Sequence, residues 1–143
     1  MYKAQALPPE VIHEILQYID KDQLVSVALT CRSYQAEAER LLYERVTMDD
    51  TLRADRVCLK TLATSPRKAA LVRSFHLNWS RVAVGMAHLQ TLGNALLGMK
   101  SLKFLYLHLH WCQVGRVQVI LIPIFRCGRK LDVERVLAES SFL

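Results

Sequence analysis

His108, His110 and Cys112 are residue types that bind zinc, and their alternate spacing would bring them together. In an extended strand, every second side chain lies on the same face, so all three would share one side. A tetrahedral zinc site needs a fourth ligand or a water molecule, and no partner cluster follows at a usual spacing. We therefore expect no metal site, and we interpret these residues as the polar face of a strand.

Two other patterns each lack a residue that their chemistry requires. The stretch His13–Gln17 resembles half of a metalloprotease helix, but Gln17 stands where the second histidine belongs. Gly93 and Gly98 have the spacing of a phosphate-binding loop, but Met99 replaces the lysine and the stretch has a helical pattern. Paired carboxylates, a nucleophile elbow and a dinucleotide-type glycine pattern are also missing from the sequence. We expect a protein that is not an enzyme and needs no cofactor.

Ser65 is the best candidate for regulation. It begins the segment Ser65-Pro66-Arg67-Lys68, which is similar to the sites of proline-directed kinases. The simpler interpretation is that Pro66 ends a helix and that the two basic residues face solvent. The sequence favours this simpler interpretation, and Ser65 stays a possible phosphorylation site.

A helical region from Leu7 to Val46 is the first element that could position functional groups. Pro8 and Pro9 suit the start of a helix, where a missing N–H costs nothing. The apolar residues of this first helix follow at helical spacing: Val11, Ile12, Ile15, Leu16 and Ile19. Asp20 can cap a second helix that is apolar nearly all round, with Leu24, Val25, Val27, Ala28 and Leu29. A third helix from about Arg32 carries Tyr34, Ala38, Leu41, Leu42 and Val46 on one side.

This region is too short and too apolar to bury all of its apolar residues in a core of its own. A unit of about 40 residues is at the lower limit for folding without a metal, a disulfide or a partner. Apolar residues at helical spacing more often form a core than an interface, so periodicity alone does not decide between the two. The excess of apolar surface favours an interface.

The residues of this region also resemble a known motif. The resemblance rests on Leu7-Pro8, Glu10-Val11, Ile15-Leu16, Ile19, Leu24, Cys31-Arg32 and Leu42-Tyr43. In order and spacing they are similar to an F-box, the motif that docks on the Skp adaptor of cullin ubiquitin ligases. Tyr34 departs from the pattern, since many F-boxes carry a tryptophan there. The resemblance implies an adaptor-binding surface made of Leu7, Pro8, Val11, Ile15, Leu16, Leu24, Cys31 and Tyr34, with Leu7 and Pro8 as a wedge and Ile15 and Leu24 as central anchors.

The second half contains a weak repeat with an offset of thirty residues. Leu59 aligns with Leu89, and the segment Val72–Leu77 aligns with Leu102–Leu107. Both segments fit the strand signature Leu-x-x-Leu-x-Leu of leucine-rich repeats, although the period is longer than usual. Each copy reads as a helix followed by a strand, and stacked copies would share one core. After Cys112 the repeat register is lost.

An F-box followed by such units resembles F-box proteins with leucine-rich-like repeats, a type expanded in fungi. The resemblance covers residues 7–110, and family members usually carry more repeats. We therefore expect a truncated member or a misread gene beyond that point. The expected fold is α+β and mostly α: an F-box at 1–50, two leucine-rich-repeat-like units at 51–112, and a segment of uncertain fold at 113–143.

Charge and composition agree with an intracellular protein of two modules. Residues 1–50 have a net charge of −4 and residues 51–143 a net charge of +10. The four cysteines are widely spaced, which indicates reduced thiols. The apolar run Val117–Phe125 is far shorter than the ~20 residues that span a bilayer. Without a signal peptide, we expect a cytoplasmic or nuclear protein with no membrane partner.

The F-box resemblance implies a substrate adaptor of a Skp–cullin–F-box ubiquitin ligase, which binds a protein substrate through its repeats. One alternative is a scaffold or truncated remnant that binds the adaptor but captures no substrate. A weaker alternative is a module whose basic second half binds nucleic acid. The sequence favours the substrate adaptor and no nucleic-acid partner, because the basic residues are scattered.

Overall fold

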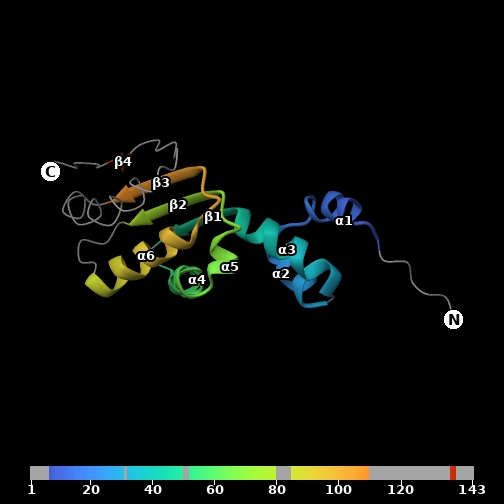
Figure 1. Ribbon diagram of the computed structural model, residues 1–143, viewed down its shortest axis with the longest axis horizontal. Coiled ribbons are helices and arrows are strands. Elements are labelled where there is room, and N and C mark those ends of the chain that lie inside the picture. Colours follow the sequence, from blue (N-terminus) through green and yellow to red (C-terminus); the bar gives the residue numbers. More distant parts are fainter. Residues whose placement is uncertain (1–6, 31, 50–51, 80–84, 110–135, 138–143) are drawn as a thin grey trace. The chain divides into compact units, whose positions relative to one another are not determined.

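The computed structural model describes residues 7–30, 32–49, 52–79, 85–109 and 136–137. The chain divides into two compact units between Glu44 and Arg45. We call them the N-terminal unit and the C-terminal unit, and each is described by itself (Figure 1).

The N-terminal unit consists of three helices, α1 (Pro9–Leu16), α2 (Lys21–Thr30) and α3 (Arg32–Glu44). Pro8 is the N-cap of α1 and Pro9 its first residue, so the missing N–H groups fall where the helix needs no donor. The carbonyl of Asp20 accepts hydrogen bonds from the N–H groups of Gln23 and Leu24, each at 3.0 Å, and so begins α2. These helix starts confirm the predicted three-helix arrangement.

The core of the N-terminal unit is small. Helix α3 packs against both α1 and α2. The fully buried members of the core are Ile12, Leu16, Leu24 and Ala38. Half-buried apolar residues surround them: Ile19, Val27, Ala28, Tyr34, Leu41 and Leu42. Other apolar residues of the same helices therefore lie outside this core.

The C-terminal unit alternates strands and helices. Its elements are β1 (Arg45–Asp49), α4 (Arg53–Thr64), α5 (Pro66–Ala69), β2 (Ser74–Trp79), α6 (Met86–Gly98), β3 (Phe104–Leu109) and β4 (Val136–Leu137). The strands form a parallel sheet in the order β1-β2-β3-β4. Helices α4, α5 and α6 cover one face of this sheet (Figure 1). The predicted α+β class with a helix–strand stack is confirmed.

The strand register confirms the thirty-residue repeat. Phe75 pairs with Leu105, and Leu77 pairs with Leu107. All four side chains are buried, as the signature requires of the residues that face the helices. In the helices, the aligned residues Leu59 and Leu89 are buried as well. The repeat is therefore a true structural repeat, because aligned residues hold equivalent places.

One sequence-based prediction is wrong for the described residues, and the sheet has a strand pair beyond the predicted repeat. Val46 does not belong to the third helix but to β1, where it pairs with Phe75 at an offset of twenty-nine. Pairing with β2 decides this, since a β-branched residue packs well on a sheet. The strand pairing also continues after Cys112, because Val136 pairs with Leu107 at the same offset of twenty-nine.

The core of the C-terminal unit lies between the sheet and the helices. Its largest fully buried side chains are Phe75, Leu62, Leu89, Leu92, Leu96, Met99, Leu105 and Val72. Helix α6 approaches α5 so closely that a Cβ atom on Gly98 would lie 2.9 Å from the Cβ of Ala69. Gly98 is therefore a packing residue, which accounts for the second glycine of the phosphate-loop-like pair without a phosphate.

We expect Gly98→Ala to destabilise the C-terminal unit by about 1–3 kcal/mol, because overpacking costs that much in a tight interior. Replacing glycine by alanine in a helix gains at most about 1 kcal/mol, so the clash dominates. Denaturant unfolding of the full chain measures the change. The control is Gly85→Ala, whose Cβ would meet His88 Nδ1 at an ordinary 3.8 Å and should cost less than about 1 kcal/mol. Equal stability of Gly98→Ala and the wild type would contradict the close approach of α5 and α6.

Candidate functional site

Helix α1 has apolar residues on two sides. Ile12 and Leu16 point into the core and are only 5% and 4% exposed. Val11 and Ile15, spaced four apart, lie on another side of the helix and are 41% and 50% exposed, and Leu7, two residues before the helix begins, is 45% exposed. We call these three residues the α1 stripe. The unit has no room in its core for this second side.

Helix α2 and the turn before it add further exposed apolar residues. Leu24 is buried in the core at 3% exposed, whereas Val25 and Leu29 are 50% and 83% exposed. Val25 and Leu29 are four residues apart, so they lie on one side of α2, and we call them the α2 stripe. Tyr18, just after α1, is 81% exposed. Side chains this large and apolar, gathered on two short helices, mark an interaction surface.

The eight residues predicted to bind the adaptor differ in their exposure to solvent. Leu7, Pro8, Val11 and Ile15 are exposed. Leu16 and Leu24 belong to the core, and Tyr34 is half-buried against it. Cys31 lies outside the described residues. The role of Leu24 in this structure is to hold α2 in the unit, so its contact with a partner stays a prediction.

The sequence-based prediction did not include Tyr18, Val25 and Leu29 among the binding residues. The signal for the α2 stripe was present, since α2 is apolar nearly all round and a three-helix unit can bury only one side of it. Tyr18 follows the last turn of α1, where helical spacing gives no information about exposure.

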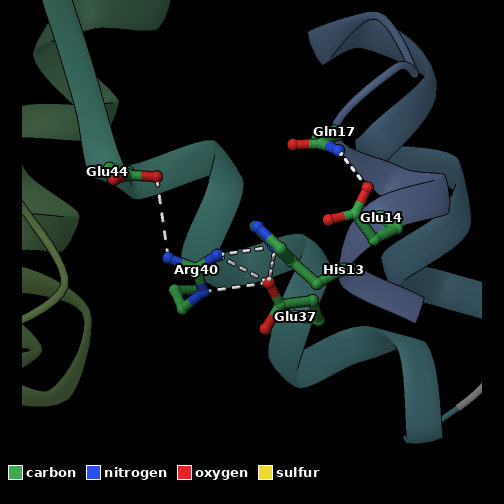
Figure 2. A network of polar contacts seen from close by, with 6 residues as sticks. All are labelled: His13, Glu14, Gln17, Glu37, Arg40 and Glu44. Atoms are coloured by element: carbon green, nitrogen blue, oxygen red, sulfur yellow. Dashed lines mark hydrogen bonds and ion pairs between the residues drawn. The ribbon is translucent and has the colours of Figure 1, made fainter. Parts of the chain in front are cut away.

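A polar network joins α1 to α3 (Figure 2). The Oε1 atom of Glu37 lies 2.6 Å from His13 Nδ1 and accepts hydrogen bonds from Arg40 Nε at 2.9 Å and Arg40 Nη2 at 2.7 Å. Arg40 Nη1 lies 3.6 Å from Glu44 Oε2. Because His13 sits on the same helix as the α1 stripe, this network helps to fix that stripe relative to α3.

His13 Nδ1 has two partners that require opposite protonation of this atom. A protonated Nδ1 donates to Glu37 Oε1, whereas an unprotonated Nδ1 accepts from Arg40 Nη2, which lies 2.8 Å away. One nitrogen cannot do both at the same time. Either form of the imidazole therefore keeps one contact between α1 and α3, with Glu37 or with Arg40.

The charges of the network lower the pKa of Glu37. Partial burial by itself raises this pKa, but the hydrogen bonds from Arg40 and His13 and the charges of both outweigh it. The hydrogen bond to Glu37 is likewise the main reason that the pKa of Arg40 is raised. Both directions favour the charged pair in the folded protein.

Those of the other candidate residues that the structure describes show no reactive arrangement. In the ranges that the structure describes, no group of three metal-binding side chains lies close together. His110 and Cys112 of the predicted zinc-like pattern lie outside these ranges, whereas His108 is half-buried on β3. Burial, more than the nearby charge of Asp55, raises the pKa of the Cys58 thiol. The raised pKa makes this thiol a poor nucleophile.

Ser65 lies between α4 and α5 and is half-buried. Its backbone is extended, with φ −118° and ψ 91°, and its carbonyl accepts the N–H of Ala69 at 3.0 Å. Helix α4 ends at Thr64, shortly before Pro66, as the simpler interpretation of this segment requires, and Pro66 then begins α5. Phosphorylation of Ser65 stays a prediction.

None of the helices within the described residues has the length and apolar character needed to cross a bilayer.

We expect Glu37→Gln to destabilise the chain by roughly 1 kcal/mol at neutral pH, because it removes the charge that Arg40 and His13 stabilise. Since the pKa of Glu37 is lowered in the folded state, its contribution is present above the unfolded-state pKa and is lost as the pH falls through the folded-state pKa. The difference between wild type and variant should therefore shrink from about pH 7 to about pH 3. Urea midpoints followed by circular dichroism measure it.

The matched control is Glu39→Gln, on the same helix and with the same change in charge. A loss at Glu37 that is no larger than the loss at Glu39, or that persists at acidic pH, would show that the network does not stabilise the unit.

Comparison with known proteins agrees with this geometry. Residues 4–49 match the family model of F-box-like domains, which spans α1, α2, α3 and β1. No curated protein and no solved structure matches the chain. A domain of this kind supports binding to a Skp-type adaptor protein and a role in ligases of the Skp–cullin–F-box type. Three short helices around a small core, with apolar stripes left exposed and a matching family model, show that residues 4–49 of this chain form an F-box-like domain.

Proposed function

We propose that this chain is a substrate-recognition adaptor of a Skp–cullin–F-box ubiquitin ligase. The observation that carries the proposal is the F-box-like match over residues 4–49, together with the α1 and α2 stripes that its helices expose. Docking would remove from water the apolar surface that the unit cannot bury by itself. Burying one such side chain fully contributes about 1.5–3 kcal/mol, and these residues are already partly buried.

The stripes also explain which residues should dominate the binding energy. Ile15 lies at the end of the α1 stripe and is 50% exposed, while the core on the other side of α1 holds the helix in place. Interface energy concentrates in a few such residues that become fully desolvated. The His13–Glu37–Arg40 network supports the same helix, so that the stripe is preorganised before a partner arrives.

The proposed mechanism is proximity and not catalysis. The N-terminal unit would hold the adaptor, and the helix–strand units of the C-terminal unit, which resemble leucine-rich repeats, would hold a protein substrate near the charged ubiquitin carrier of the ligase. The chain itself would supply no catalytic group, cofactor or metal ligand. A cytoplasmic or nuclear location fits this role, since ligases of this type act there.

We expect Ile15→Asp to weaken binding to a Skp-type adaptor more than about 100-fold. A charge left buried and unpaired at an interface costs about 3 kcal/mol or more. Because Ile15 is half exposed in the free chain, the variant should still fold. Calorimetric titration of the full chain with the adaptor measures the loss, and circular dichroism checks the fold.

The control is Val57→Asp, the same kind of change at a residue of α4 that is 60% exposed. It should bind the adaptor like the wild type. Wild-type binding by Ile15→Asp would exclude the α1 stripe from the interface. Adaptor binding without cullin-dependent turnover of any protein would favour the scaffold alternative.

A further inference from the structure

The outward surface of the helices in the C-terminal unit combines a basic part and an apolar part. Helices α4 and α6 pack side by side on the same face of the sheet (Figure 1). The thirty-residue offset relates them, since the aligned residues Leu59 and Leu89 both face the core. The outward residues then correspond as well: Arg56 with Met86, and Lys60 with Gln90.

The outward side of α4 is basic. Arg53, Arg56 and Lys60 are exposed and follow at spacings of three and four, so they lie on one side of the helix. The acidic residue of α4, Asp55, lies on the other side, where its Oδ2 accepts a hydrogen bond from the backbone N–H of Asp49 at 2.6 Å. Val57, at 60% exposed, sits among the basic residues.

The outward side of α6 carries no charged residue of the Asp, Glu, Lys or Arg type. The whole helix, Met86–Gly98, lacks these four residue types. Two of its large apolar side chains, Met86 and Leu97, are 70% and 47% exposed, and Gln90 lies between them. We call the exposed residues Arg53, Arg56 and Lys60 of α4 the basic ridge. We call Met86, Gln90 and Leu97 of α6 the apolar ridge.

We propose that this surface of α4 and α6 docks an acidic amphipathic helix of a protein substrate. The inference rests on the proposed function and deepens it by naming the class of substrate segment. Charge complementarity carries it: the described residues of the C-terminal unit include nine Lys or Arg but only two Asp or Glu. The apolar side of such a helix would lie on Met86, Leu97 and Val57, and its acidic side toward Arg56 and Lys60.

The same residues favour a protein helix over other anionic partners. Packed helices lie 8–10 Å apart, so a third helix can contact two neighbouring ridges at once. Nucleic acid would use the basic ridge but would leave the exposed apolar residues of α6 without a partner. A lipid surface is bound through Trp, Phe and Leu in larger numbers than this face provides.

The face of the sheet opposite the helices is a less suitable place for an acidic partner. Its middle row consists of Thr47, His76 and Tyr106, which are aligned across three strands. His76 and Tyr106 pack edge to face with ring centroids 5.7 Å apart. This row contains no lysine or arginine, and on the same face of β1 the exposed Arg45 is matched by the carboxylate of Asp49, so the face has no excess of positive charge to attract carboxylates.

The test uses the full chain and a labelled synthetic peptide of about 18 residues, held helical by a covalent side-chain bridge because closely spaced like charges oppose helix formation in water. Its leucines follow helical spacing and its other positions are mainly glutamate. Fluorescence anisotropy measures binding to the wild type, to Arg56→Glu with Lys60→Glu, and to Lys100→Glu with Lys103→Glu. The second pair makes the same change in charge at exposed residues outside α4 and α6. Met86→Ser with Leu97→Ser tests the apolar ridge.

We expect the change at Arg56 and Lys60 to weaken binding at least tenfold, the change at Lys100 and Lys103 to weaken it less than threefold, and the serine pair to weaken it severalfold. Peptide binding that falls equally in both charge variants, or that survives scrambling of the leucine positions, would overturn the proposal. A chain that binds single-stranded DNA or phosphatidylserine vesicles but not the peptide would also overturn it. Loss of peptide binding in Tyr106→Ala, with binding kept in the variants of α4 and α6, would place the peptide on the sheet instead. Co-elution with a Skp-type adaptor, measured on the same preparation, separates failure of this surface from failure of the proposed function.

Discussion

A three-helix unit of this size has one interior, and α1 and α2 each bring more apolar surface than that interior can take. Ile12 and Leu16 occupy the core from one side of α1, so the α1 stripe on the other side must face water or a partner. The same holds for α2, where Leu24 is buried and Leu29 is exposed. Because exposed apolar surface costs free energy in water, this shortage of interior space links the fold of the unit to the binding of a partner.

Polar contacts determine where that surface is presented. Glu37 is the centre of the network between α1 and α3, and it is stabilised in its charged form by Arg40 and His13. Side chains in this network are partly exposed, at 37% for His13 and 22% for Glu37, so the energy involved is modest. Its value lies in orientation, since three helices around a small core have few other contacts that fix one helix against another.

The C-terminal unit buries its apolar residues in a different way from the N-terminal unit. Parallel strands with a period close to thirty residues place one apolar row after another on the same face of the sheet. Each helix then covers the row that precedes or follows it, and the core extends from unit to unit. What such a stack exposes is set by the outward residues of its helices, which differ between α4 and α6 although the inward residues are alike. The two repeats therefore share their packing but differ in the residues they expose.

The amino-acid sequence by itself determined the helices of the N-terminal unit, the start of α1 at the prolines, and the thirty-residue offset between Phe75 and Leu105, because these follow from local patterns of apolar residues and turns. It did not determine which apolar side of α2 would be buried, since Leu24 and Leu29 look equivalent until α3 packs on one of them. Nor did it reveal β1, where Val46 continues a helical pattern and only pairing with β2 makes it a strand. The proximity of Gly98 to Ala69 and of His13 to Glu37 likewise depends on residues far apart in the chain. Local periodicity specifies the elements, but the choice of which face is buried is made only by the neighbours that the tertiary structure supplies.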